Sequence, residues 1–176
     1  MSNLILVTFV TRYGSTAEVA DVIATTLRAR NLAIDVAPIS EITNLDAYYA
    51  IIIGTPLYIG KWPNAVHRFL KRNRNVLNTQ QVAIFTLGPI KVDLEEMQQA
   101  QKCVEKELER YEWLQPTAKV VFTGKYDPAK LNFQHKVLAK LPASPLYDLP
   151  KTDNRNWHAI RFWAEHMADQ LVEMET

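Results

Sequence analysis

The chain has little of what marks a secreted or membrane-spanning protein. It contains one cysteine, Cys103, so it can form neither an internal disulfide nor a cysteine-based metal cluster. No apolar run approaches the ~20 residues that a bilayer crossing requires. The first residues, Met1-Ser2-Asn3, carry no basic leader, and the apolar run after them is too short for a signal peptide. We therefore expect a cytoplasmic protein.

An excess of charge of either sign is also missing. The formal net charge is +1, and the basic residues form no extended stripe. The short basic run from Lys71 to Arg74 lies at the end of a predicted helix, where the helix dipole favours cations. We therefore expect no nucleic-acid partner. The 4 histidines are scattered along the chain, and the sequence predicts no metal site.

Short β-rich runs alternate with helical patterns, which is typical of a parallel sheet covered by helices on both faces. The predicted strands are residues 4–10, 34–36, 50–54, 82–87 and 118–122. The predicted helices begin near residue 16, run over 63–73 and 93–113, and close the chain from 157 onward. Pro63 suits a first helical turn, and Asp93 with Glu96 forms an acidic capping box. We predict one α/β domain over residues 1–176, with five parallel strands in a doubly wound sheet.

The stretch from Gly124 to Asp153 interrupts this alternation between the fifth strand and the last helix. A plain alternation needs only a few residues there, so this stretch is an insertion. It is either functional or a cap over exposed core, and the sequence leaves both open. Its amphipathic piece fits a peripheral membrane contact or a solvated cap, through Lys130, Lys136, Lys140, Leu131, Leu138 and Leu141.

The strongest local signal is the loop from Thr11 to Thr16, between the first strand and the first helix. A turn there directs backbone N–H groups and the positive end of a helix dipole at one point. Gly14 permits backbone conformations that other residues disfavour, and three hydroxyls add uncharged donors. The loop is neither a Walker loop nor a dinucleotide fingerprint. It predicts a site for a terminal phosphate, or else an ordinary helix start with a capping box of Ser15 and Glu18.

Two further loops favour the phosphate interpretation. In an open α/β sheet, ligands bind beyond the carboxyl ends of the strands, where the strand order reverses. The loops after the third and fourth strands consist of Thr55, Pro56, Leu57, Tyr58, Ile59 and Gly60, and of Leu87, Gly88, Pro89, Ile90 and Lys91. A flat ring such as isoalloxazine would fit between them, with Tyr58 against the ring. Trp62 fits either ring contact or a hydrophobic staple before the helix at Pro63.

The pattern Thr11-x-x-Gly14-x-Thr16-x-Glu18-Val19-Ala20 after an apolar strand resembles the phosphate loop of the flavodoxin family. The resemblance covers most of the chain, and it implies a flavodoxin-like fold with strand order 2-1-3-4-5 and bound FMN. It also implies that Thr11, Arg12, Tyr13, Gly14, Ser15 and Thr16 surround the phosphate, with contact through the backbone at Arg12 and Tyr13. The loops 55–60 and 87–91 would flank the flavin.

Within the family, the chain is most similar to the branch that contains menaquinone-dependent protoporphyrinogen dehydrogenase. The shared features are the Thr-Arg-x-Gly-x-Thr loop, the loop from Ile53 to Gly60 and a closing helix that begins at Trp157. The resemblance implies an FMN-dependent oxidoreductase that passes electrons to a quinone or another small molecule. The basic and aromatic insertion of that branch is only loosely echoed by residues 125–140. An electron carrier with a redox partner protein and a flavin-free interaction domain are the alternatives.

The near-neutral charge favours the oxidoreductase over the carrier, because carrier flavodoxins are strongly acidic and so disfavour an anionic reduced flavin. Lys61 and Lys91 lie in the two flanking loops. Each would favour the anionic reduced ring by up to ~1 kcal/mol if solvated. No residue is predicted to act as a catalytic acid or base, because the isoalloxazine itself carries the redox chemistry. The oligomeric state stays open.

Overall fold

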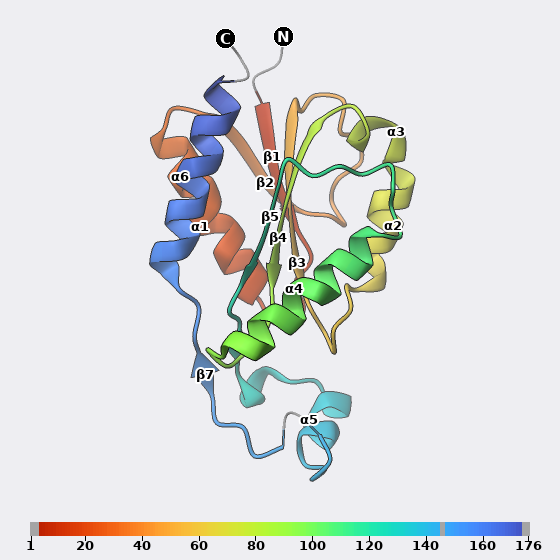
Figure 1. Cartoon of the computed structure of the whole chain (residues 1–176), viewed down its shortest axis with the longest axis vertical. Helices are drawn as coiled ribbons and strands as arrows, with labels where there is room; N and C mark the ends of the chain where they lie inside the picture. The colour runs from red at the N-terminus through yellow and green to blue at the C-terminus, as the bar shows by residue number, and fades with distance from the viewer. Residues whose placement is uncertain (1–3, 145–146, 174–176) are drawn as a thin grey trace.

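A computed structural model describes residues 4–144 and 147–173, and of Leu138 the backbone alone. Its centre is a parallel five-stranded sheet in the order β2-β1-β3-β4-β5 (Figure 1). The strands are β1 (Leu4–Phe9), β2 (Ala33–Pro38), β3 (Ala50–Pro56), β4 (Gln81–Leu87) and β5 (Ala118–Phe122). The predicted flavodoxin-like topology is confirmed.

Helices cover both faces of the sheet. On one face, α1 (Ser15–Ala29) and α6 (Trp157–Glu173) pack against Ile5 and Val7 of β1. On the other face, α2 (Asn64–Arg72), α3 (Arg74–Leu77) and α4 (Leu94–Leu108) pack against Leu6, which points the opposite way. The central strands are therefore buried on both faces, which is why their sequences are continuously apolar.

Gly54 has a different role from the one its position predicts. The sequence places a strand end at Gly54, but β3 continues to Pro56. A Cβ atom at Gly54 would lie 2.2 Å from Cζ of Phe85, so the glycine leaves room for that ring. Phe85 is fully buried against Phe122 and Trp163. The glycine serves packing between neighbouring strands, and the strand runs on towards the site.

The helix boundaries differ from the predicted ones at three places. The helix predicted over 93–113 ends at Leu108, and the buried Tyr111 and Leu114 lie in the turns after it. Pro63 is the residue before α2, with an extended backbone, instead of lying in its first turn. The short helix α3 was not predicted. Asp93 caps α4 as predicted, because its Oδ1 accepts a 3.0 Å hydrogen bond from the backbone N of Glu96.

The insertion lies at the carboxyl ends of the strands, at the opposite end of the molecule from both termini (Figure 1). It begins and ends in a small antiparallel pair, β6 (Lys125–Tyr126) and β7 (Thr152–Asp153). Between them lie a 3-10 turn, η1 (Pro128–Lys130), and the helix α5 (Phe133–Ala139). Tyr126 and Leu131 are buried, so Leu131 is not free to meet a membrane.

Candidate functional site

The amino-terminal end of α1 is built to leave its backbone amides free. Gly14 precedes the helix with a left-handed φ of 88°, and its N–H donates to Oγ1 of Thr11 over 2.9 Å. The predicted capping box is wrong, because Ser15 is already the first helical residue and Glu18 forms ion pairs elsewhere. Glycine has no side chain that could cap the first turn of α1. The backbone N–H groups of that turn therefore remain available to an anion.

Thr16 supplies an unused donor at the same place. Its side chain is 1% exposed, and its Oγ1 has no hydrogen-bond partner among the described residues. Burying an unpaired hydroxyl costs free energy, so such groups are uncommon and call for an explanation. Thr8 and Thr86, in strands, share this property. Of the three, Thr16 lies in the first turn of a helix, where a bound phosphate would accept a hydrogen bond from its hydroxyl.

The loop after β3 is a tight turn beside this end of α1. Tyr58 and Lys61 exchange backbone hydrogen bonds of 2.9 and 3.1 Å, and Ile59 and Gly60 between them have φ angles of 50° and 71°. Positive φ is unfavourable for a β-branched residue, yet Ile59 is 90% exposed and not held by packing. The guanidinium of Arg12 lies 5.8 Å from the ring centre of Tyr58. This contact joins the loop to the phosphate loop.

Tyr58 and Trp62 differ in their surroundings. Burial raises the pKa of Tyr58 to about 12, against the opposing charge of Arg12, so the phenol keeps its proton. Tyr58 remains half-buried and can offer its ring to a ligand. Trp62 is 3% exposed and lies 6.4 Å from the ring of His67, four residues after Pro63. That is the staple arrangement, so Trp62 belongs to the core.

The loop after β4 is tied to its neighbours on both sides. The N–H of Leu57 donates to the carbonyl of Leu87 over 2.8 Å, which joins this loop to the one after β3. The N–H of Gly124 donates to the carbonyl of Pro89 over 2.8 Å, which joins this loop to the insertion, and the Nδ2 of Asn154, directly after the insertion, donates to the carbonyl of Ile90 over 2.7 Å. Lys91, at the end of the loop, is exposed. The structure therefore brings together the three loops that the sequence singled out.

Helix α5 completes the site with a residue that sequence reasoning missed. Arg12 Nη1 lies 3.3 Å from Nε2 of His135, and the hydroxyl of Tyr13 lies 2.5 Å from Nδ1. A guanidinium can only donate, so Nε2 accepts and Nδ1–H donates to the Tyr13 oxygen. The side chains of Arg12 and Tyr13 thus face the insertion.

A charge network fastens the other side of the insertion. Arg155, with a side chain 2% exposed, binds both carboxylate oxygens of Asp153 at 2.8 and 2.6 Å. It also meets Glu18 Oε2 at 2.7 Å and donates to the carbonyl of Ser15 at 3.3 Å. Its guanidinium lies 4.4 Å from the ring centre of Trp157. The network therefore holds β7 and the start of α6 against the first turn of α1.

The network lowers the pKa values of both acids. Burial raises the pKa of Glu18, but the hydrogen bond and charge of Arg155, assisted by Lys125, outweigh it and leave that pKa below its ordinary value. The hydrogen bond from Arg155 also lowers the pKa of Asp153. Both groups are therefore charged at neutral pH, so the guanidinium is neutralised and adds little attraction for a phosphate.

The chain matches a known family over most of its length. A family model described as Flavodoxin domain matches residues 6–153, which include all three loops and the insertion. The chain belongs to the flavodoxin family. A comparison with curated protein sequences found no match. The family match supports flavodoxins as a whole and not the protoporphyrinogen dehydrogenase branch in particular.

Solved flavodoxins have the same fold. A flavodoxin from the domain Archaea superposes with a TM-score of 0.57 at 12% identity, over 96% of this chain and 98% of that one. The flavodoxin of Streptococcus pneumonia TIGR4 gives 0.57 at 17%, over 97% and 99%. Oxidised Flavodoxin 2 from Bacillus cereus gives 0.54 at 19%, over 97% and 98%. At these identities the likeness establishes the fold.

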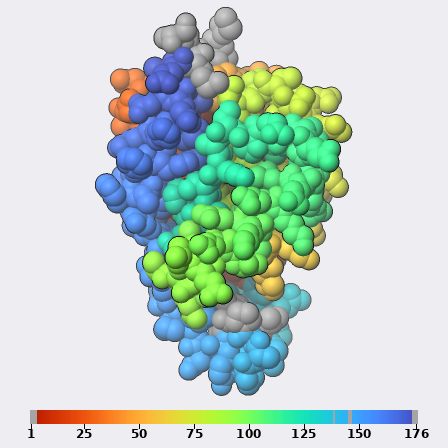
Figure 2. Space-filling model, viewed as in Figure 1, coloured from red at the N-terminus to blue at the C-terminus, as the bar shows by residue number. Residues whose placement is uncertain are grey.

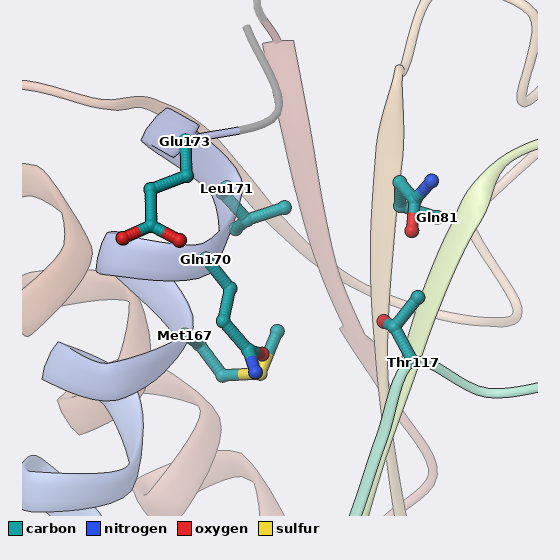
Figure 3. A pocket seen from close by; sticks show the side chains of 6 residues that line it. All are labelled: Gln81, Thr117, Met167, Gln170, Leu171 and Glu173. Atoms are coloured by element: carbon teal, nitrogen blue, oxygen red, sulfur yellow. The ribbon is translucent and has the colours of Figure 1, made fainter.

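Other locations in this flavodoxin-like chain are less suited to a ligand. A pocket of 210 Å³ lies between the end of α6 and the amino-terminal ends of β4 and β5, with Gln81 and Gln170 on its walls (Figure 3). It is smaller than typical cofactor sites and lies at the wrong end of the sheet. Among the described residues, no three His, Cys, Asp or Glu side chains are grouped to hold a metal ion. No described helix has the length and apolar character to cross a bilayer.

Proposed function

We propose that this chain binds FMN at the amino-terminal end of α1 and transfers electrons through it. The observation that carries the proposal is the buried hydroxyl of Thr16, which has no hydrogen-bond partner within residues 4–144 and 147–173, in a first turn without a side-chain cap, at the sheet edge where this family binds its ligand. FMN would supply the redox chemistry. Residues 11–16 would hold its phosphate, and the loops 55–60 and 87–91 would flank its ring.

The role that the comparisons favour is that of an electron carrier for a partner protein. Several solved structures that cover nearly the whole chain are flavodoxins, and the family match is to the flavodoxin domain itself. No catalytic acid or base is needed for this role, because FMN exchanges electrons directly with the redox centre of the partner. A carrier would turn over only when a partner reductase and an acceptor protein are supplied.

The second candidate is a dehydrogenase that passes electrons from a small molecule, such as protoporphyrinogen, to a quinone. It is favoured by the exposed Lys61 and Lys91 at the two flanking loops and by a net charge of +1. Cations at these positions favour an anionic reduced flavin and so raise its potential. Oxidation of protoporphyrinogen with a quinone as the only acceptor would assign the enzyme. Turnover only with protein partners would assign the carrier.

FMN binding itself is tested by titrating the purified chain with FMN and following the quenching of flavin fluorescence. Thr16→Glu places a carboxylate where the phosphate would lie, and it should abolish binding. Thr25→Glu is the matched control, because Thr25 is exposed on the same helix two turns further on. It should bind as the wild type does. Absence of binding by the wild type, or equal binding by Thr16→Glu, would refute the proposal.

A further inference from the structure

An apolar stripe is exposed on the insertion. Phe133 is 82% exposed, Val137 47% and Leu141 52%. The spacing of four residues places them on one side of α5 and of the turn that continues it. Single exposed apolar residues are ordinary, but a contiguous group on one helix marks an interaction surface. Nothing in the loops or in the flavin proposal uses these three side chains.

Lysines border this stripe. Lys130, Lys136 and Lys140 are exposed, and no acidic residue occurs in the sequence between Asp127 and Asp148. Asp127 is neutralised by Lys151 at 3.0 Å. We call the three apolar residues and the three lysines the α5 face. Its chemistry complements a surface that is apolar beneath a layer of negative charge.

The α5 face lies at one end of the long axis of the molecule (Figure 1). In the space-filling view the insertion forms a rounded tip (Figure 2). A rounded tip with apolar side chains suits a deformable lipid surface, into which the side chains insert while the lysines meet the headgroups.

We propose that the α5 face docks this chain on the surface of an anionic lipid bilayer. The face is joined to the phosphate loop, because His135 on the same helix bonds Arg12 and Tyr13. Docking would therefore hold the carboxyl ends of the strands close to the membrane. This consequence rests on the proposed function, since it places the flavin near an acceptor dissolved in the bilayer. The docking itself does not depend on flavin.

The test is flotation with vesicles of phosphatidylcholine alone and of an equal mixture of phosphatidylcholine and phosphatidylglycerol. Wild-type protein should float with the anionic vesicles and not with the neutral ones. Salt at ~0.5 M should release it, because screening shortens the reach of the lysines to a few ångström. Failure to bind the anionic vesicles would overturn the proposal, even if the FMN titration succeeds.

The role of the lysines is tested with a double variant and a matched control. Lys136→Gln with Lys140→Gln should weaken binding roughly thirtyfold, since each lysine near an anionic surface contributes about a fivefold factor. Lys102→Gln with Lys106→Gln has the same spacing on the exposed side of α4 and should change nothing. Equal binding by both double variants would overturn the proposal.

The apolar stripe is tested in the same way. Phe133→Ser should weaken vesicle binding at least about tenfold, by removing a large side chain from the lipid. Phe162→Ser is the control, because Phe162 is 65% exposed and lies on α6, outside the insertion. Sedimentation should show that the wild type is not a dimer held by this face. A dimer that dissociates in Phe133→Ser would assign the face to a second copy, and tighter binding to polyglutamate than to vesicles would assign it to an acidic protein.

Discussion

Replacing Thr16 by valine should change the stability of the fold and the affinity for FMN in opposite directions. Valine keeps the shape of threonine and removes the hydroxyl of Thr16, a residue that is 1% exposed and whose hydroxyl finds no partner in the part of the chain that the structure describes. An unpaired buried polar group costs about 1–3 kcal/mol. Without FMN, the variant should therefore be more stable than the wild type. We expect a gain of about 1 kcal/mol, at the lower end of this range, because valine does not fill the space of threonine perfectly. The Tm of the variant should rise by roughly 2–4 °C.

The same change should weaken FMN binding. A hydrogen bond to a charged group contributes about 1.5–3 kcal/mol, so loss of the bond to the phosphate should raise Kd roughly 10- to 150-fold. The assay is fluorescence titration with FMN beside thermal unfolding with and without it. Thr8→Val is the control, because Thr8 is another buried threonine with an unpaired hydroxyl, and it should gain stability without losing affinity. A stabilised Thr16→Val variant with unchanged Kd would refute the placement of the phosphate.

Three further outcomes follow from the insertion. Arg155→Met should lower the free energy of unfolding by about 2 kcal/mol in urea, because it removes the charged hydrogen bonds to Glu18 and Asp153 and leaves Lys125 as their nearby cation; a loss below about 0.5 kcal/mol would contradict this. Both acids have lowered pKa values, so the stability they contribute is complete above about pH 5 and lost as the pH falls through their folded pKa values; acid titration of Arg155→Met should show a smaller loss, because Lys125 still pairs with both acids. His135→Ala should speed FMN release about fivefold, and adding Tyr13→Phe should change the rate no further, which stopped-flow fluorescence measures; additive effects would show that the pair does not act together.

The sheet could be predicted because the burial of each central strand is visible in the strand's own sequence. A strand buried on both faces, such as the one around Ile52, is apolar without interruption. Gly54 was misjudged as a strand end because its reason lies on another strand, where Phe85 places its ring. A local pattern shows that a residue is small, and it does not show which neighbour requires the space.

The candidate site likewise contains residues that the sequence could predict and residues that it could not. Gly14 and Thr16 could be singled out because a glycine and a hydroxyl at a strand-to-helix turn have local consequences for backbone and donors. His135 and Arg155 could not, because their partners in the phosphate loop and in α1 lie 122 and 140 residues away in sequence. A histidine in an amphipathic segment offers no signal of its own. Contacts of that range are a product of the topology, which brings the insertion to the carboxyl ends of the strands.

The insertion contributes buried residues of its own and also contacts two loops of the candidate site. Leu131 is buried, His135 contacts the phosphate loop, and the N–H of Gly124 donates to the carbonyl of Pro89 in the loop after β4. A segment fastened to two of the three loops cannot move away without releasing them. A ligand that orders those loops would therefore also stabilise the insertion in the position seen here, and the reverse would hold by linkage. If the chain binds FMN as proposed, we expect its retention to be coupled to the position of the α5 face.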